Sequence, residues 1–530
     1  MSLMARGEGA GLLLKGFTLK EWLSPPQPGR RLLGWLGPLL VTAFAAFFRF
    51  DRLGQPHAVV FDETYYAKDA LALLTFGVEH STIKDAKGKD LADPLILKGD
   101  TDSIWTGGGS FVAHPPAGKW MIASGEWLFG MTPFGWRFAA ALFGTLSVLV
   151  LARVTRRMTR STLLGTGAGL LLALDGLHLV ASRTAILDVF VMFWVLAAFG
   201  CLVVDRDVAR ARLADRVDDL RSGPGLGMRF GPGLGMRWWR LGAGICLGLA
   251  CGTKWSAIFF VAAFGVMTFL WDSGARRAAG IRRPFVGALR RDALPGFVSV
   301  VIVSAVTYVA TWAGWFASDI GWGRHWADGR GGTFSFVPAP LRSLWHYHAQ
   351  VMGFHTGLDD KHRYQSWPWD WPLLRRPVAF YYSEPSGCGA AKCSREVLGV
   401  GTPAIWWAAL LALAVLLGWW LVHRDWRAGA ALLGYGAGLV PWFYYAAGDR
   451  TMFAFYATPM IPFMVLAIVL ALGLLLGPAD DSGRRLVGAT LSGAYMLTVL
   501  ANFYLLHPIL TARVLTYDAW RFRIWFDSWI

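Results

Sequence analysis

Two adjacent carboxylates, Asp62 and Glu63, are the residues of this chain best suited to acid or base chemistry. They follow the first long apolar run and lie between aromatic and aliphatic residues, where an ionised group is costly. A carboxylate held in such a place can accept the proton of an attacking hydroxyl. The pair also fits the first turn of a short helix that ends near Gly77, where acidic side chains complement the helix dipole. The residues alone leave both interpretations open.

Single cations occupy four short connections next to long apolar runs. Together they could bind an anionic ligand, most simply the phosphate of a lipid-linked substrate. Alternatively, each side chain reaches a lipid headgroup at the end of its own helix. These cations are Arg137, Arg183, Lys254 and Arg450.

Other polar residues fit a ligand site near the same surface. Pro115 and Pro116 fix the backbone between His114 and Lys119, and Asp188 lies about one turn inside an apolar run. The histidines of the second large loop suggest a metal, but no ligand spacing with cysteine or carboxylate accompanies them, so no metal site is predicted. These histidines are His325, His346, His348, His355 and His362.

The elements that must position these residues are membrane helices. Of the 530 residues, 55% are hydrophobic and 16% are charged, and the mean hydropathy is +0.42, which excludes an ordinary soluble domain. The net charge of +16 does not indicate nucleic-acid binding, because much of the basic excess lies in short loops between apolar runs. Eleven spans are predicted at 32–50, 134–152, 162–181, 184–204, 238–253, 255–271, 295–315, 403–422, 429–447, 453–476 and 487–507.

Arginine-rich connections fall on one side of these spans, which the positive-inside rule assigns to the cytoplasm. We therefore expect a cell-membrane protein with a cytoplasmic tail over 1–31 and a membrane domain over 32–507. Its loops 51–133 and 316–402 and its tail 508–530 are expected on the extracytoplasmic side.

The second large loop carries two further features. Trp367 opens a Trp-Pro-Trp-Asp-Trp-Pro run that predicts either a rigid aromatic platform for a substrate or an interfacial belt. Cys388 and Cys393 share the oxidising side of the membrane and could form a disulfide.

Several motifs occur in an order that resembles the protein O-mannosyltransferases. The likeness covers nearly the whole chain, and the C-terminal segment resembles the actinobacterial members in particular. Eukaryotic members insert a β-trefoil MIR domain into the second large loop, and 316–402 is too short to contain one. The motifs are Phe61–Glu63, His114–Pro116 with Gly118–Lys119, Arg137, Ser182–Arg183 with Leu187–Asp188, Thr253–Trp255, Tyr364–Trp367 with Trp371–Leu374, and Pro508–Ala512 with Tyr517–Phe526.

The resemblance implies a GT-C glycosyltransferase fold, an all-α polytopic membrane protein of about eleven transmembrane helices with helices in its extracytoplasmic loops. It implies a polyprenyl-phosphate mannose donor and Ser or Thr acceptors on proteins emerging from the Sec translocon. Asp62 is then the expected general base and Glu63 orients acceptor or donor. Arg137 is the expected main phosphate ligand, supported by Arg183 and Lys254.

The same resemblance gives a binding or positioning role to His114, Lys119, Asp188, Gln365 and Trp367. No cofactor is expected, because a lipid phosphate is already a good leaving group whose charge fixed cations can stabilise. A single displacement at the anomeric carbon inverts its configuration.

Two alternatives stay open. Another GT-C transferase could attach a sugar from the same donor class to a glycan, lipid or cell-wall polymer, because only the acceptor would differ. A lipid or sugar transporter would also place polar groups among apolar spans, but it should show internal repeats or broken helices at mid-membrane, and no long repeat is present.

Overall fold

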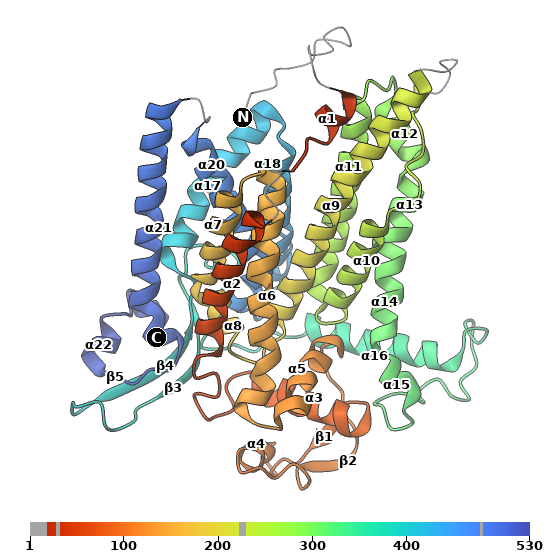
Figure 1. The fold of residues 1–530 in the computed structure, drawn as a ribbon. Coiled ribbons are helices and arrows are strands. Elements are labelled where there is room, and N and C mark those ends of the chain that lie inside the picture. Colours follow the sequence, from red (N-terminus) through yellow and green to blue (C-terminus); the bar gives the residue numbers. More distant parts are fainter. Residues whose placement is uncertain (1–17, 28–31, 89, 222–228, 478–480) are drawn as a thin grey trace.

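The protein is a bundle of long helices that run in similar directions, with smaller elements gathered at one end (Figure 1). The structure is a computed structural model that describes residues 18–27, 32–88, 90–221, 229–477 and 481–530. Within these residues, seven helical segments are long and apolar enough to cross a membrane, as expected of a multi-pass membrane protein. They are α6 (Pro133–Thr159), α9 (Asp188–Arg221), η2 (Trp255–Ala257) with α11 (Ile258–Ala278), α13 (Ala293–Phe297) with η3 (Val298–Ile302) and α14 (Val303–Thr311), α17 (Pro403–His423), η4 (Ala454–Met460) with α20 (Ile461–Leu476), and α21 (Ser482–Leu510).

The other four predicted spans are shorter or interrupted helices. The predicted run 162–181 is divided because the Asp175 carboxylate accepts a hydrogen bond from the backbone N–H of His178 at 2.8 Å and so starts a new helix. The run 429–447 is divided at Pro441, which has no N–H to continue the preceding helix. These places hold α2 (Leu33–Phe50), α7 (Thr162–Ala173), α8 (Gly176–Ala181), α10 (Trp238–Cys251), α18 (Trp426–Leu439) and α19 (Pro441–Ala447).

Helix α20 belongs to the interior of the bundle, and α21 to its surface. Every residue from Ile461 to Leu470 is buried, and α20 packs against α7, α17, α18 and α21. In contrast, only 17% of the most apolar 18-residue stretch of α21 is buried. Most of that apolar surface therefore faces outward, as expected of a helix in contact with lipid. Helix α10 packs closely on η3 and α14, because Gly244 leaves room where a side chain would collide with the carbonyl of Ser299.

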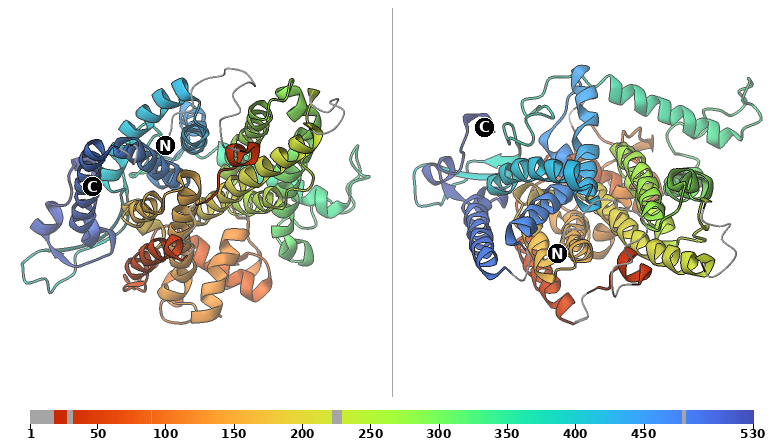
Figure 2. Two further views of the ribbon diagram at one scale, coloured as in Figure 1. Left: turned by 45° about the horizontal axis from the view of Figure 1, so that its top comes forward. Right: turned by 90° about the horizontal axis from the view of Figure 1, so that it is seen from above.

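The two large predicted loops lie at the same end of the bundle, here called the loop end (Figures 1 and 2). The first loop forms three helices and a two-stranded antiparallel sheet, and the second begins with two helices. Helix α5 packs between α3 and α6, which fixes the first loop on the membrane helices. The elements are α3 (Glu63–Phe76), β1 (His80–Thr82), α4 (Ala92–Ile96), β2 (Trp105–Gly109), α5 (Ala117–Phe129), α15 (Ala313–Ala317) and α16 (Ala339–Thr356).

A second antiparallel sheet, which the all-α prediction did not include, joins the second loop to the C-terminal segment. Its order is β3-β4-β5, and Ser394 of the central strand pairs with Leu515. The C-terminal segment is buried at Trp529, whose indole N–H donates to the carbonyl of Leu374 at 2.7 Å. The elements are β3 (Val378–Ser383), β4 (Cys393–Gly399), β5 (Leu515–Thr516), α22 (Tyr517–Arg521) and η5 (Asp527–Trp529).

The opposite end of the bundle carries the arginine-rich connections. Helices α1 (Leu19–Leu23) and α12 (Pro284–Arg291) lie there (Figure 1). Some of its cations are paired, as where Arg276 meets Asp292 at 2.7 Å. The two large loops and the main basic clusters therefore occupy opposite ends, as the topology prediction requires.

Candidate active site

Asp62 lies at the turn from which α3 begins, and its carboxylate does not cap that helix. No hydrogen bond to this carboxylate is present among the described residues, so the helix-capping interpretation does not account for it. Burial, offset by the charge of Lys254 and reinforced by that of Asp188, raises the pKa of Asp62 to about 7. A carboxylate with this pKa is suited to accept a proton near neutral pH.

Glu63, the next residue, forms a buried ion pair with Arg137. The two side chains are 0% and 1% exposed, and the guanidinium donates to the Glu63 oxygens at 2.7 and 2.9 Å. The same carboxylate accepts hydrogen bonds from the backbone N–H groups of Val60 and Ala185, both at 3.0 Å. Glu63 therefore ties the turn before α3 to Arg137 of α6 and to the backbone at Ala185, and a contact of Glu63 with substrate stays a prediction.

Arg137 was expected to bind phosphate, but its donors are used inside the protein. Besides its bonds to Glu63, it donates to the carbonyls of Leu53, Pro56 and Ala58 at 3.3, 3.0 and 2.8 Å. These contacts engage all five N–H groups of a guanidinium. Arg137 thus fastens the loop before α3 to the start of α6.

Arg183 also uses donors of its guanidinium inside the protein. Its guanidinium donates to the carbonyls of Phe48, Arg49 and Asp51 at 2.7–2.9 Å, and to that of Arg52 at 3.3 Å. These carbonyls belong to the C-terminal end of α2, where a cation satisfies otherwise unpaired acceptors and complements the helix dipole. The sequence could not show this, because the partners are more than 130 residues away.

Lys254 is the one of the three expected phosphate ligands that lies near Asp62. Its ammonium group contacts both oxygens of Asp188 at 3.0 Å, and it also lies 4.4 Å from the ring centroid of Tyr456. Asp188 therefore orients Lys254. Both residues lie near Asp62, and their roles toward a substrate stay predictions.

His114 and Lys119, the first and last residues of the His-Pro-Pro-Ala-Gly-Lys motif, have different surroundings. Lys119 is fully buried and pairs with Glu79 at 2.5 Å and Asp69 at 3.4 Å, so it holds the first loop together. The ring of His114 lies 6.1 Å from Tyr66 and 5.3 Å from His355. Burial, followed by the charge of Lys254, keeps the pKa of His114 well below its usual value, so the ring is neutral.

Phe61, which precedes Asp62, has an unusual backbone. Its φ is +48°, a left-handed conformation that is strained for a bulky residue. Its ring lies 5.0 to 6.3 Å from four other rings, mostly edge to face. These rings come from three separate segments and hold Phe61 where it is. They are His362, Phe380, Phe453 and Phe455.

The segment 358–366 of the second loop is fastened to the turn before η4. The backbone N–H of Thr451 donates to the carbonyl of Leu358, and that of Ser366 donates to the carbonyl of Met452, both at 2.9 Å. The hydroxyl of Thr451 donates to the carbonyl of Asp360 at 2.5 Å. We call this unit, 358–366 with 450–455, the stapled segment.

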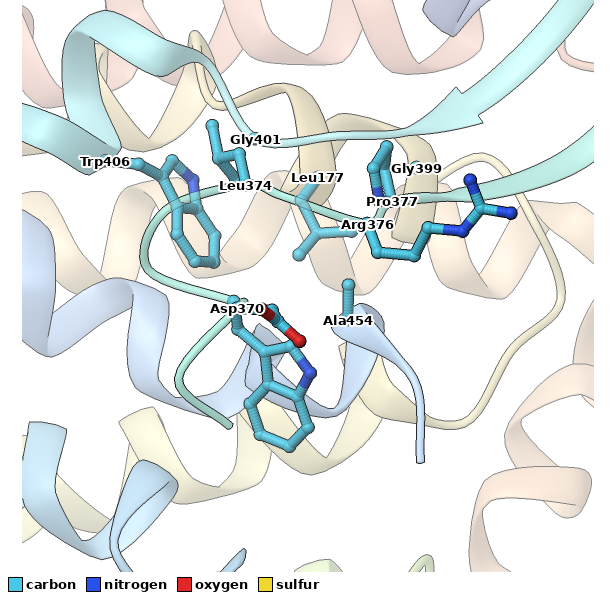
Figure 3. Close-up of a pocket in the computed structure, with 10 residues that line it drawn as sticks. Leu177, Asp370, Leu374, Arg376, Pro377, Gly399, Gly401, Trp406 and Ala454 are labelled. Carbon is cyan, nitrogen blue, oxygen red and sulfur yellow. The ribbon is translucent and has the colours of Figure 1, made fainter. Parts of the chain in front are cut away.

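Gln365 and Trp367 lie at the far end of this segment. The backbone of Trp367 donates to Asp370 at 3.0 Å, and its ring stacks on Trp369 at 5.6 Å. Asp370 lines a small cavity of about 10 Å³, which has room for about one water molecule (Figure 3). No contact among the described residues joins Gln365 or Trp367 to Asp62, and their role toward a substrate stays a prediction. The other residues that line the cavity are Leu177, Trp371, Leu374, Arg376, Pro377, Gly399, Gly401, Trp406 and Ala454.

Sequence analysis counted Arg450 among four possible anion ligands and His355 among the histidines considered for a metal, and it gave no site role to Tyr456. The structure brings these three residues to Lys254 and His114. Arg450 donates to the carbonyl of His355 at 2.9 Å, and its guanidinium lies 5.8 Å from the ring centroid of Tyr456. The available signal was the isolated cation in a short turn. The aromatic and histidine partners carry no such signal.

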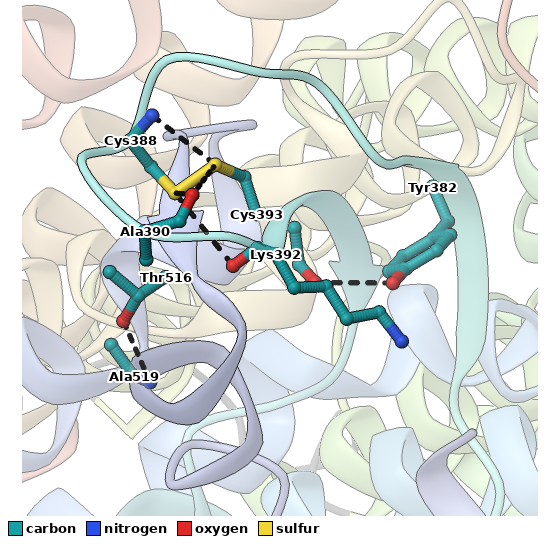
Figure 4. Close-up of a disulfide and its surroundings, with 8 residues drawn as sticks. Tyr382, Cys388, Ala390, Lys392, Cys393, Thr516 and Ala519 are labelled. Atoms are coloured by element: carbon teal, nitrogen blue, oxygen red, sulfur yellow. Dashed lines mark hydrogen bonds between the residues drawn. A yellow bond between two sulfur atoms is a disulfide. The ribbon is translucent and has the colours of Figure 1, made fainter.

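Cys388 and Cys393 are joined by a disulfide near the tip of the β3–β4 hairpin, with their Cα atoms 5.9 Å apart (Figure 4). Thr516, which caps α22 by accepting from the N–H of Ala519, lies beside this bridge. Among the described residues, no group of three His, Cys, Asp or Glu side chains is arranged to hold a metal ion.

Comparison with solved structures identifies the fold. The chain superposes on a chain of the donor-bound protein O-mannosyltransferase Pmt1-Pmt2 complex of Saccharomyces cerevisiae with a TM-score of 0.71 at 14% identity, over 97% of this chain and 94% of that one. The fold is thus that of a GT-C membrane glycosyltransferase.

Sequence comparisons identify the family. A model of dolichyl-phosphate-mannose-protein mannosyltransferases matches residues 39–215, and a model of the C-terminal four-transmembrane region of protein O-mannosyltransferases matches 340–529. Polyprenol-phosphate-mannose–protein mannosyltransferases from Mycolicibacterium smegmatis (strain MKD8) and Mycobacterium tuberculosis (strain H37Rv) are each 42% identical, over 96% and 95% of this chain and 95% and 93% of theirs. The Corynebacterium glutamicum protein is 33% identical over 92% of both chains. This chain belongs to the protein O-mannosyltransferase family.

Proposed function

We propose that this protein transfers mannose from polyprenyl-phosphate mannose to Ser or Thr hydroxyls of proteins, at the loop end of the bundle, with Asp62 as general base. The observation that carries the base assignment is the position of the Asp62 carboxylate, which caps no helix and lies near Lys254. The Glu63–Arg137 pair and the rings around Phe61 hold it there.

The reaction needs one proton acceptor and one site for developing charge. Asp62 takes the hydroxyl proton as the acceptor oxygen bonds to the anomeric carbon, and the bond from that carbon to the phosphate oxygen breaks. The electron pair stays on the phosphate, so polyprenyl phosphate leaves with added negative charge that nearby cations stabilise. A single displacement inverts the anomeric centre, and no divalent metal is required by this scheme.

We further propose that the loop end is extracytoplasmic. The positive-inside rule supports this orientation, because the main arginine-rich connections lie at the opposite end. The Cys388–Cys393 disulfide at the loop end also fits an oxidising compartment. Acceptors would then be secreted or membrane proteins that reach this face from the translocon.

The test uses the full chain in lipid nanodiscs with polyprenyl-phosphate mannose and a Thr-rich peptide, and a glycan acceptor in parallel. We expect transfer to the peptide, and Asp62→Asn should lower it by about two to four orders of magnitude while the protein remains folded. Asp102→Asn, an exposed acid of the same loop, is the matched control and should remain active. Near-normal transfer by Asp62→Asn would exclude this base, and transfer to the glycan alone would exclude the protein acceptor. Activity with and without a chelator tests the absence of a metal requirement.

A further inference from the structure

A groove in the membrane part of the bundle lies apart from the candidate active site, between α17, α20 and α21. Its volume is about 840 Å³, within the range of about 300–1,000 Å³ that is typical of ligand sites. Helix α20 forms its floor, where Ile468 is 3% exposed, and α17 and α21 form its rims, where Leu411 and Leu491 are 72% and 50% exposed. Apart from Arg484 and Tyr495, every residue that lines the groove is aliphatic or glycine. Such a surface suits a hydrocarbon chain.

The groove follows from the way α21, at the edge of the bundle, packs on its neighbours (Figure 1). At Gly488, α21 lies so close to the end of α20 that an added Cβ would be 2.5 Å from the carbonyl oxygen of Leu475. Farther along α21, the hydroxyl of Tyr495 donates to the carbonyl of Ala404 in α17 at 3.3 Å. The groove is therefore part of the packing of long helices, as in a preformed site.

The length and the charge of the groove match one leaflet of a membrane. Along α21 its lining residues run from Gly483 to Tyr495, which is about 18 Å at about 1.5 Å per residue. The hydrocarbon of one leaflet is about 15 Å deep, half of about 30 Å for the bilayer. Arg484 and Arg485 are exposed and lie where α21 begins, at the end of the bundle opposite to the loop end. A lipid chain in the groove would thus carry its headgroup to two cations.

Simpler interpretations of the two arginines do not account for the groove. The positive-inside rule explains cations at this end of the bundle, but it does not explain an apolar groove beside them. Capping of α20 uses one donor of Arg484, whose guanidinium donates to the carbonyl of Leu474 at 3.3 Å. Most of its five N–H groups therefore have no partner among the described residues. A membrane-spanning helix of a partner would need a face about 30 Å long, and the groove follows α21 for about 18 Å.

We propose that this groove binds an anionic phospholipid from the leaflet at the end of the bundle opposite to the loop end. One acyl chain lies along α17, α20 and α21, and the phosphate accepts hydrogen bonds from Arg484 and Arg485. The lipid thereby joins α17 to α21, the helix that leads into β5 and α22. The inference concerns no reacting group, so it does not depend on the proposed function.

The first test removes the two charges. Full-length protein in detergent is titrated with phosphatidylglycerol or phosphatidylcholine, and native mass spectrometry counts the bound molecules. We expect the wild type to bind its first phosphatidylglycerol at least about tenfold more tightly than phosphatidylcholine, because each basic residue near the membrane surface favours an anionic headgroup. Arg484→Gln with Arg485→Gln should lose this preference. Arg282→Gln with Arg283→Gln, another exposed pair at the same end, is the matched control and should keep it. An unchanged preference in the Arg484 and Arg485 double variant would overturn the proposal.

The second test fills the groove. Ala471 of α20 lines it, so Ala471→Phe occupies the place of the acyl chain, and Ala489→Phe, on the exposed side of α21 and outside the groove, is the matched control. We expect Ala471→Phe to bind one phosphatidylglycerol fewer than the wild type and the control. Addition of phosphatidylglycerol should raise the melting temperature of the wild type and the control but not that of Ala471→Phe. Equal lipid counts in folded Ala471→Phe and in the wild type would contradict the assignment.

Two further measurements separate a phospholipid from other occupants. Polyprenyl phosphate is added to the protein that holds phosphatidylglycerol, and the mass of the complex shows whether one or two chains are present. Retention of phosphatidylglycerol by a single chain supports the proposal. Displacement by an equal amount of polyprenyl phosphate would assign the groove to that lipid instead, and a dimer that Ala471→Phe converts to a monomer would assign it to a second copy of this chain. Either result would overturn the proposal.

Discussion

Removing Arg137 should destabilise the protein before it affects the lipid donor. Its guanidinium and the Glu63 carboxylate are 1% and 0% exposed, so Arg137→Ala leaves a carboxylate buried without its counter-ion. Breaking one side of a buried pair costs about 3–5 kcal/mol. Three carbonyls of the loop before α3 also lose their donor. We therefore expect a loss of several kcal/mol in Arg137→Ala, a large part of the stability of a typical domain.

A double variant separates the charge from the packing. Glu63→Gln with Arg137→Gln removes both charges and leaves side chains that can still form hydrogen bonds, so it should be less destabilised than Arg137→Ala. The difference arises because the double variant buries no unpaired ion.

The assay is thermal unfolding in nanodiscs at one scan rate, because membrane proteins often unfold irreversibly, followed by titration with polyprenyl phosphate well below the unfolding temperature. The folded fraction of Arg137→Ala should bind the lipid normally. Wild-type thermal stability combined with weakened lipid binding would refute this reasoning and return Arg137 to the phosphate site.

Four further outcomes are expected. Because burial raises the pKa of Asp62 to about 7 and a base must be ionised, transfer should rise with pH through about 7 and fall about tenfold per pH unit below it; a flat profile between pH 5.5 and 8 would exclude this base. The same raised pKa means that ionisation opposes folding, so Asp62→Asn should be at least as stable as the wild type above pH 7, as a melting series across pH will show. Phe61→Leu loses the ring contacts, and Phe61→Gly relaxes the left-handed backbone. Both variants should lower kcat by about tenfold or more with a smaller change in donor KM. Kinetics matching the wild type in both variants would show that the four rings around Phe61 have no positioning role. Reduction of the Cys388–Cys393 bridge should cost at most about 2 kcal/mol because the closed loop is short, measured as a small fall in melting temperature; free thiols at both positions without reductant would contradict the bridge.

Much of the architecture could be predicted from the sequence because membrane helices are recognisable as long apolar runs. The long apolar runs, the two large loops and the place of Asp62 in the first loop all follow from hydropathy and the distribution of arginine. The small sheets could not be predicted in the same way. Strands such as β5, with two residues, depend on partners far along the chain.

The partners of the cations near the site could not be predicted, for the same reason. A lone cation in a short turn has no visible partner in the sequence, so Arg137, Arg183, Lys254 and Arg450 looked alike. Their roles differ because of groups brought from elsewhere: the Glu63 carboxylate for Arg137, the end of α2 for Arg183, and Asp188 for Lys254. Arg450 differs from Arg137 and Lys254 because no carboxylate of the described residues lies within ion-pair distance of it.

The stapled segment has a consequence for the order of events at the site. Its backbone bonds join the turn that contains Arg450 to the stretch that leads into Trp367, and Phe453 of the same segment touches Phe61 beside Asp62. We expect these bonds to carry a shift at one end of the unit to the other, and in that case binding of lipid and of polypeptide is thermodynamically coupled. Coupling of this kind is reciprocal: if the lipid tightens the hold on the polypeptide by some factor, the polypeptide tightens the hold on the lipid by the same factor. After transfer, the same coupling would act on the two products. With positive coupling, the modified polypeptide and the spent lipid would each slow the release of the other, and with negative coupling each would speed it.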